Sequence, residues 1–287
     1  MNHRIIARLD IKGPNLVKGI HLEGLRVLGK PEDFASYYNE SGADELLYMD
    51  VVASLYDRNS LKDIITRTAK EIFIPLTVGG GLRTIEDITE VLRYGADKVS
   101  LNTAAIKNPE IIRQASEAFG SSTIVIAIEA IKQSEGKYLC YTDNGREYTG
   151  IDAFEWAQKV EELGAGEIII TSVDKEGTGE GFDVELTRRI SENAKIPVIA
   201  HGGPGKLEHF KEILEEGKAD AVSVASMLHY SYAAKNKSKN NFEKEGNVTF
   251  LNSGKDFSRI SKAEIMDIKK YLTENDIDCR YTEGAEA

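Results

Sequence analysis

Two acidic residues, Asp10 and Glu129, stand where they could act as general acid and general base. Asp10 lies in the segment RLDI at the end of the apolar run 4–11, and Glu129 lies in the similar segment AIEA after the apolar run 123–128. Two carboxylates in unequal environments can divide proton donation and acceptance between them. An acidic residue after a strand can also simply cap the next helix. The recurrence in two similar segments favours the catalytic interpretation.

Two glycine-rich segments predict phosphate sites. GGG at 79–81 and GG at 202–203 each follow an apolar run, and two polar pairs end the next runs, Asn102 with Thr103 and Ala225 with Ser226. Glycines let the backbone approach a phosphate closely, while helix N-termini and hydroxyls donate hydrogen bonds to its oxygens. One such site is common in α/β barrels. Two copies indicate a long substrate with a phosphate at each end.

Other charged residues allow two interpretations each. Arg4, Glu45, Lys98 and Glu167 begin apolar runs. They could be solvated, or their alternating signs could form a salt-bridged ring that closes the bottom of a barrel. Lys18 lies in NLVKGIHLEG, which we expect to be a long loop after the first strand. It could be solvated there or fold over a bound phosphate.

The order of predicted elements positions these residues. Apolar runs at 4–11, 46–51, 74–78, 98–101, 123–128, 167–172, 197–200 and 221–224 predict buried parallel strands. Segments at 31–42, 60–72, 84–94, 108–119, 152–164, 184–193, 206–217 and 261–275 predict helices. This alternation favours a (β/α)8 TIM barrel over an open doubly wound sheet.

An internal repeat supports one barrel over residues 1–287, built from half-barrels at about 1–120 and 121–287. Asp10 corresponds to Glu129, Asp50 to Asp174, TVGGGLRTIED to AHGGPGKLEHF and VSLNTAA to VSVASML. The Lys- and Asn-rich segment 231–257 precedes the last helix and lacks a helical period. We interpret it as a surface insertion, with a substrate lid as the alternative.

Composition excludes several function classes. With 36 Lys and Arg against 47 Asp and Glu, the formal charge of -11 argues against nucleic-acid binding. The N-terminus lacks the apolar segment of a secretory signal, and no run approaches the ~18 apolar residues of a membrane span. Two cysteines and five scattered histidines indicate neither a disulfide framework nor a metal site. We expect a cytoplasmic protein without metal, cofactor or membrane contact.

The sequence resembles the cyclase subunits of imidazole glycerol phosphate synthase, from histidine biosynthesis. The match covers about residues 3–230 and resumes at 262–280. It is carried by RIIARLDIK, LVKG, GADELLYMDVVAS, PLTVGGG, GADKVSLNTAAI, GAGEIIITSVDKEGT and IPVIAHGGPGKLEHF. The resemblance implies a two-half barrel that acts as a lyase. Ammonia from a partner glutaminase would convert a bis-phosphorylated ribulosyl aminoimidazole carboxamide ribonucleotide to imidazole glycerol phosphate and an aminoimidazole carboxamide ribotide (AICAR).

The resemblance also implies roles for individual residues. Asp10 and Glu129 match the catalytic pair, and Lys18 matches a loop lysine. Arg4, Glu45, Lys98 and Glu167 match an ammonia gate on the N-terminal face of the barrel, where the glutaminase docks to form a heterodimer. The predicted substrate- and phosphate-binding residues are Lys18, Asp50, Gly80, Gly81, Asn102, Thr103, Thr171, Asp174, Gly177, Gly202, Gly203, Ala225 and Ser226.

Four departures from the family surround the predicted catalytic mouth. Glu129 replaces an aspartate, and its extra methylene moves the carboxylate by about 1 Å, a displacement that can cost ~10²-fold in rate. Arg8 stands at a usual cysteine, His201 stands at a usual serine, and the 231–257 insertion is atypical. The gate residues are unchanged. The pattern suggests retained ammonia delivery with altered chemistry.

Three alternatives to the cyclase therefore remain. The first is a family paralogue that uses glutaminase-derived ammonia to amidate a sugar in surface-polysaccharide biosynthesis. It is favoured by Glu129, Arg8 and His201 and opposed by Asp10 and the two phosphate sites. The second is the isomerase of the preceding step, against which LNTAA and the charged ring count. The third is a non-catalytic scaffold that activates a glutaminase.

Overall fold

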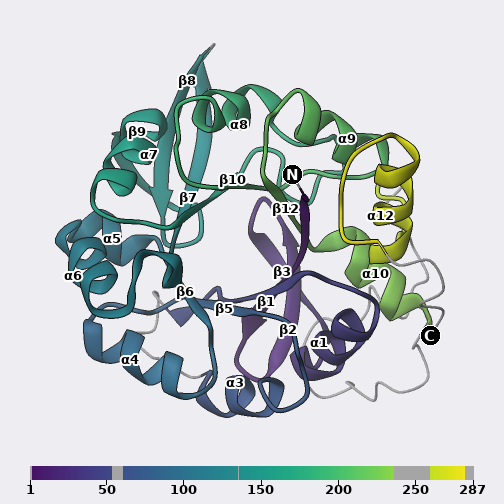
Figure 1. Cartoon of the computed structure of the whole chain (residues 1–287), viewed down its shortest axis with the longest axis horizontal. Coiled ribbons are helices and arrows are strands. Elements are labelled where there is room, and N and C mark those ends of the chain that lie inside the picture. Colours follow the sequence, from purple (N-terminus) through teal and green to yellow (C-terminus); the bar gives the residue numbers. More distant parts are fainter. Residues whose placement is uncertain (1, 54–60, 135, 236–258, 282–287) are drawn as a thin grey trace.

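Eight parallel strands form a closed barrel at the centre of the molecule (Figure 1). The computed structural model describes residues 2–53, 61–134, 136–235 and 259–281. Pairing of β10 with β7 and of β12 with β1 completes the circle, so the predicted (β/α)8 barrel is confirmed. In barrel order the strands are β1 (Arg4–Lys12), β4 (Glu45–Asp50), β5 (Leu76–Gly79), β6 (Lys98–Leu101), β7 (Ile124–Ser134), β10 (Glu167–Ser172), β11 (Val198–His201) and β12 (Ala221–Val224).

The barrel interior changes from apolar to polar along the strands. Alternate residues of a barrel strand point inward. One inward layer is apolar and consists of Ile6, Leu47, Val125, Ile169, Ile199 and Ala221, with Met49 packed against it. Two residues further along their strands, the same alternation points buried polar side chains inward: Arg8, Thr171, His201 and Ser223. The interior therefore turns polar toward its carboxyl-end mouth.

Helices cover the outside of the barrel (Figure 1). Several begin at side-chain caps that the sequence supplies: Thr84 with Asp87, Asp152, and Asp183. The described helices include two that the sequence did not predict, α5 and α10. The set is α1 (Pro31–Glu40), α3 (Lys62–Thr68), α4 (Ile85–Arg93), α5 (Thr103–Lys107), α6 (Glu110–Phe119), α7 (Ala153–Glu162), α8 (Val184–Ser191), α9 (Glu208–Glu215), α10 (Ser226–Lys235) and α12 (Ile265–Glu274), with a 3-10 turn η1 (Ser121–Thr123).

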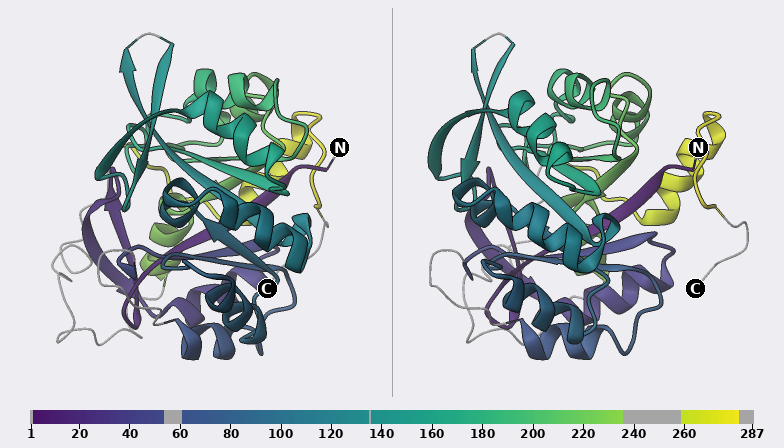
Figure 2. Two further views of the ribbon diagram at one scale, coloured as in Figure 1. Left: turned by 90° about the vertical axis from the view of Figure 1, so that its left-hand side faces the viewer. Right: turned by 60° about the vertical axis from the view of Figure 1, so that its left-hand side comes forward.

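An antiparallel extension follows the first strand of each half. β2 (Asn15–Ile20) and β3 (Glu23–Gly29) extend β1, while β8 (Lys137–Thr142) and β9 (Glu147–Asp152) extend β7. The hairpin of β7 and β8 projects from the body (Figure 2). The expected loop around Lys18 is therefore wrong, since this residue lies on β2. The turn between β8 and β9 has a signal in the sequence, the residues Asp143, Asn144 and Gly145, all of which have positive φ.

The expectation for 231–257 is corrected in its first five residues. These residues belong to α10, and the remainder of that segment lies outside the described residues. Helix α10 buries Met227, Leu228, His229, Ser231 and Ala233. Because so much of its surface is buried, it has no clear polar face to mark a helical period in the sequence.

Across the parts of the chain that are described, no helix combines the length and apolar character needed to cross a bilayer.

Candidate active site

The carboxyl ends of β1 and β7 hold Asp10 and Glu129 at the barrel mouth. The two strands are four positions apart in the ring of eight, so they face each other. Asp10 is 3% exposed and Glu129 is 7% exposed. The structure thus brings together the two carboxylates that the sequence singled out.

Arg8 holds Asp10 in a buried ion pair. Its Nε donates to Asp10 Oδ1 at 2.8 Å, and its Nη1 reaches Thr171 Oγ1 at 3.5 Å. Burial alone would raise the pKa of Asp10, but the charges of Arg8 and Lys18 outweigh burial and lower it. Asp10 is therefore a permanent carboxylate at neutral pH.

Glu129 has the opposite electrostatic environment. Burial raises the pKa of Glu129 to about 7, although Arg8 acts to lower it. Its Oε2 accepts a hydrogen bond of 2.8 Å from the backbone N–H of Gly145, in the turn between β8 and β9. The mouth therefore holds one ionised carboxylate and one that exchanges its proton near neutrality, as acid–base chemistry requires.

A first pocket, of about 750 Å³ including its opening, lies at the ends of β4, β5 and β6. Its lining contains the predicted residues Asp50, Gly80, Gly81, Asn102 and Thr103, together with Glu129. Gly80 has φ +94°, and a Cβ there would lie 2.3 Å from the Asp50 carbonyl oxygen, so only glycine fits. Arg83 and Lys107, which sequence reasoning missed, add cationic side chains to this lining.

A second pocket, of about 240 Å³, lies at the ends of β11 and β12. The predicted residues Gly177, Gly202, Gly203, Ala225 and Ser226 all line it. Ser226 is the first residue of the ten-residue helix α10, so the positive end of the helix dipole faces this pocket. The two pockets lie on opposite sides of the mouth, as the duplicated glycine segments indicated.

Lys18 is buried and paired rather than mobile. Its Nζ is ion-paired with Glu176 and donates to the Gly19 carbonyl at 3.0 Å. Glu176 also accepts from the backbone N–H of Leu22 at 3.0 Å and lines the second pocket. Glu176 was not a predicted site residue, although its place beside Gly177 in the repeated segment could have indicated it.

The remaining predicted substrate residues have different settings. Thr171 is buried beside Arg8. Asp50, the last residue of β4, is buried and accepts from Val52 N at 3.1 Å. Asp174 is exposed and accepts from Lys132 N at 2.8 Å, which ties the segment after β10 to β7. Asp50 is the last residue of β4, whereas the last residue of β10 is Ser172, two residues before Asp174. The proposed equivalence of Asp50 and Asp174 is therefore wrong by two residues.

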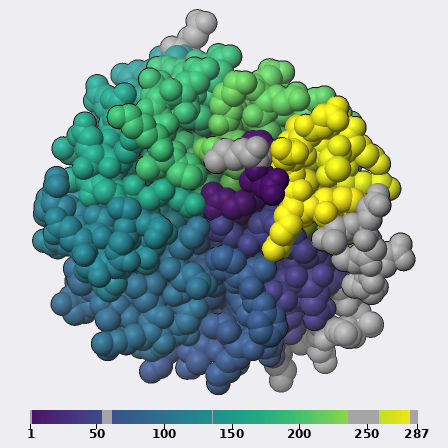
Figure 3. All heavy atoms as spheres, in the orientation of Figure 1, coloured from purple at the N-terminus to yellow at the C-terminus, as the bar shows by residue number. Residues whose placement is uncertain are grey.

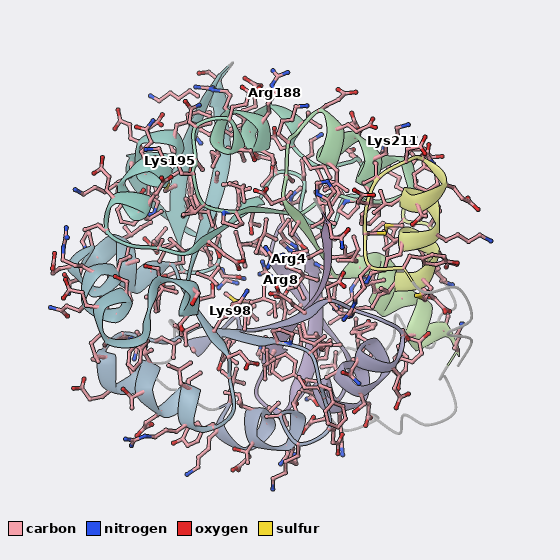
Figure 4. All side chains as sticks on the ribbon, in the orientation of Figure 1. Arg4, Arg8, Lys98, Arg188, Lys195 and Lys211 are labelled. Atoms are coloured by element: carbon pink, nitrogen blue, oxygen red, sulfur yellow. The ribbon has the colours of Figure 1, made fainter. Side chains whose placement is uncertain are left out.

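The four gate residues form a closed ring at the strand starts. Glu45 accepts from Arg4 at 2.5 Å and from Lys98 at 3.2 Å, and Glu167 accepts from the same two cations at 2.9 and 3.1 Å. Figure 4 shows Arg4 and Lys98 near the barrel axis, with Arg188, Lys195 and Lys211 further out. Figure 3 shows this face, with the N-terminal residues at its centre beside the C-terminal segment.

Within the residues that the structure describes, no group of three or more His, Cys, Asp or Glu side chains could hold a metal ion. The pockets instead offer backbone N–H groups, hydroxyls and cationic side chains, which are suited to oxyanions.

We expect Arg8→Met to destabilise the fold at pH 7 by about 3 kcal/mol, because it leaves the Asp10 carboxylate buried without its partner. Urea unfolding monitored by circular dichroism measures the loss. Arg67→Met is the matched control, since Arg67 pairs with Glu32 on the surface and its unfolding midpoint should stay near that of the parent protein. Equal midpoints for both variants would contradict the buried pairing.

Comparisons with known proteins agree with this geometry. The family described as "Histidine biosynthesis protein" matches residues 4–233, which include all eight barrel strands. A Legionella pneumophila protein named "Imidazole glycerol phosphate synthase subunit HisF" is 57% identical over 209 residues, 73% of this chain and 99% of the relative. Proteins of the same name from Methanocaldococcus jannaschii and Methanococcus vannielii are 49% and 48% identical, each over 80% of this chain and 92% of the relative.

Proposed function

This chain belongs to the histidine biosynthesis protein family, and from that premise we propose that it is the cyclase subunit of imidazole glycerol phosphate synthase. Its substrates are ammonia and a bis-phosphorylated ribulosyl aminoimidazole carboxamide ribonucleotide, and its products are imidazole glycerol phosphate and AICAR. The observation that carries the proposal is the pair of glycine-lined pockets on either side of two opposed carboxylates. A substrate with a phosphate at each end would span the mouth between them.

The two carboxylates then have separate tasks. Ammonia adds to the ribulose carbonyl, water leaves and an imine forms, after which ring closure and cleavage need further proton transfers. Asp10, ionised by Arg8, accepts protons as general base, and Glu129, with a pKa of about 7, donates them as general acid. Backbone N–H groups at Gly80, Gly81, Gly202 and Gly203 and the N-terminus of α10 bind the phosphates.

The test of the cyclase proposal uses purified protein, the histidine-pathway nucleotide and an ammonium salt. Formation of imidazole glycerol phosphate and AICAR supports the proposal. A folded protein that gives no turnover at saturating substrate would contradict it.

We further propose that a glutaminase subunit docks over the charged ring, since the relatives are named as subunits. The ring side chains remain 8–25% exposed, so they are accessible from the N-terminal face. Ammonia released there would cross the apolar layer to the mouth. We assign the enzyme to the cytoplasm, where Cys140 and Cys279, which are both free, would stay reduced.

Neutralising Lys98 tests this delivery route. Lys98→Met breaks two of the four ion pairs of the ring, so we expect glutamine-dependent synthesis to fall while synthesis from free ammonium is spared. Steady-state rates with each nitrogen source, in the presence of the glutaminase, give the ratio. An equal loss with both sources would rule out a gate.

A second candidate function is the amidation of a sugar with glutaminase-derived ammonia. One observation favours it: Arg8 engages Asp10 directly, so the carboxylate assigned to the cyclase reaction is already paired. The nucleotide assay separates the two functions. Turnover to imidazole glycerol phosphate excludes this candidate, and transfer of glutaminase-derived ammonia to a sugar without nucleotide turnover would establish it.

A further inference from the structure

Two buried polar atoms in the second pocket have no hydrogen-bond partner among the described residues. They are Nε2 of His201 on β11 and Oγ of Ser223 on β12. Both residues line the pocket, His201 is 4% exposed and Ser223 is 0% exposed. A buried polar group that is left unsatisfied costs free energy, so the pair indicates an absent partner that enters with a ligand.

The hydrogen bond of His201 determines which of its nitrogens is available. Nδ1 lies 2.9 Å from the Ser223 carbonyl oxygen, which can only accept, so Nδ1 carries the proton. Burial and the nearby charge of Arg8 lower the pKa of His201 well below its ordinary value and keep the ring neutral. Nε2 therefore presents a lone pair and can only accept.

A ligand hydroxyl satisfies both atoms. It can donate to His201 Nε2 while it accepts from Ser223 Oγ. A phosphate dianion has only acceptor oxygens, which the Nε2 lone pair would repel, and it is better held by Gly202, Gly203 and Ser226 in the same pocket. We propose that His201 and Ser223 bind a hydroxyl group of the ligand, on a carbon close to the phosphate ester. The proposal rests on the proposed function only in assigning phosphate to this pocket.

The other half of the barrel has no histidine at the equivalent place. Gly79 ends β5 as His201 ends β11, and Gly79 pairs in register with Ser100 as His201 pairs with Ser223. A Cβ at Gly79 would lie 2.6 Å from Met49 Sδ and 2.9 Å from Ser100 Cβ, so no side chain fits there. The histidine acceptor is therefore confined to the second pocket, whereas the first pocket holds Ser100 Oγ and Asn102 Oδ1 as its buried atoms without a partner among the described residues.

Removing the hydroxyls from the ligand tests the proposal without altering the protein. The full-length chain is titrated with sn-glycerol 3-phosphate, n-propyl phosphate and inorganic phosphate. Binding is followed by NMR through the ring ¹⁵N signals of His201. We expect glycerol 3-phosphate to bind at least about fivefold more tightly than propyl phosphate and to shift the Nε2 signal as a new hydrogen bond does. Equal affinities with an unchanged Nε2 signal would overturn the proposal. If none of the three binds, the phosphate assignment fails as well.

Variants then identify the residues responsible. In affinities measured by calorimetry, His201→Phe should abolish the preference for glycerol 3-phosphate, while His201→Gln, which keeps an acceptor, should retain part of it. Both variants also identify the His201 signal by its loss. Ser223→Ala should reduce the preference, and Ser100→Ala, at the equivalent place in the other half, should not change the preference seen in the His201 signal. A full preference in folded His201→Phe, or its equal loss in Ser100→Ala, would contradict the assignment.

Discussion

Asp10→Asn should reduce the cyclase turnover number by about 10²- to 10⁴-fold while phosphate binding persists. The amide has almost the same shape as the carboxylate but cannot accept a proton as a base. The Arg8 ion pair shows that this group is held as an anion at the mouth, on the side opposite Glu129. Single-turnover rates with ammonium salt, together with glycerol 3-phosphate affinity, separate chemistry from binding.

Asp152→Asn is the matched control for this substitution. Asp152 caps α7 by accepting from the backbone N–H groups of Phe154 and Glu155, and asparagine is an equally good cap. The turnover number of Asp152→Asn should stay within about twofold of that of the parent protein, because the substitution keeps the helix cap. If Asp10→Asn behaved in the same way, Asp10 would be structural, and a scaffold that only activates a glutaminase would become the better account.

The second large effect is expected at Glu129. If Glu129 is the general acid, the rate should decline as the pH rises through about 7, where this group loses its proton. Glu129→Gln should remove that limb of the pH profile and lower the rate by about 10²-fold or more. Rates between pH 5 and 9 provide the measurement. A decline on the acid side of pH 7 would instead make Glu129 a base.

The same substitution should increase the stability of the fold at high pH. Because the folded pKa of Glu129 is raised above its unfolded value, the native state retains a proton that the unfolded state has lost between about pH 4.5 and 7. Stability therefore declines with rising pH across this window. At pH 8 Glu129→Gln should be more stable than the parent by about 3 kcal/mol, and the difference should shrink to under about 1 kcal/mol at pH 5. Urea unfolding at both pH values tests the sign.

Local patterns predicted the barrel and most of the candidate site. Apolar runs without alternation located the strands, and the repeat located Asp10, Glu129 and both glycine segments. These signals depend on strand burial and on turns that only glycine can make. Helix α10 and the β2–β3 hairpin were missed, because a helix buried on most sides and a twisted antiparallel ribbon have no comparable single period.

The amino-acid sequence by itself determined the closed barrel, the two pockets at its mouth, the opposed carboxylates and the charged residues of the ring. The strands follow from burial, the pockets from glycine geometry, and the carboxylates and ring residues from their places at the ends and starts of strands. The tertiary structure alone decided that Arg8 ionises Asp10, that Glu176 engages Lys18 and that the turn at Gly145 binds Glu129. It also left His201 Nε2 without a partner. Protonation and hydrogen bonding depend on charges and desolvation contributed by strands far apart in the chain, and these are set only when the barrel closes.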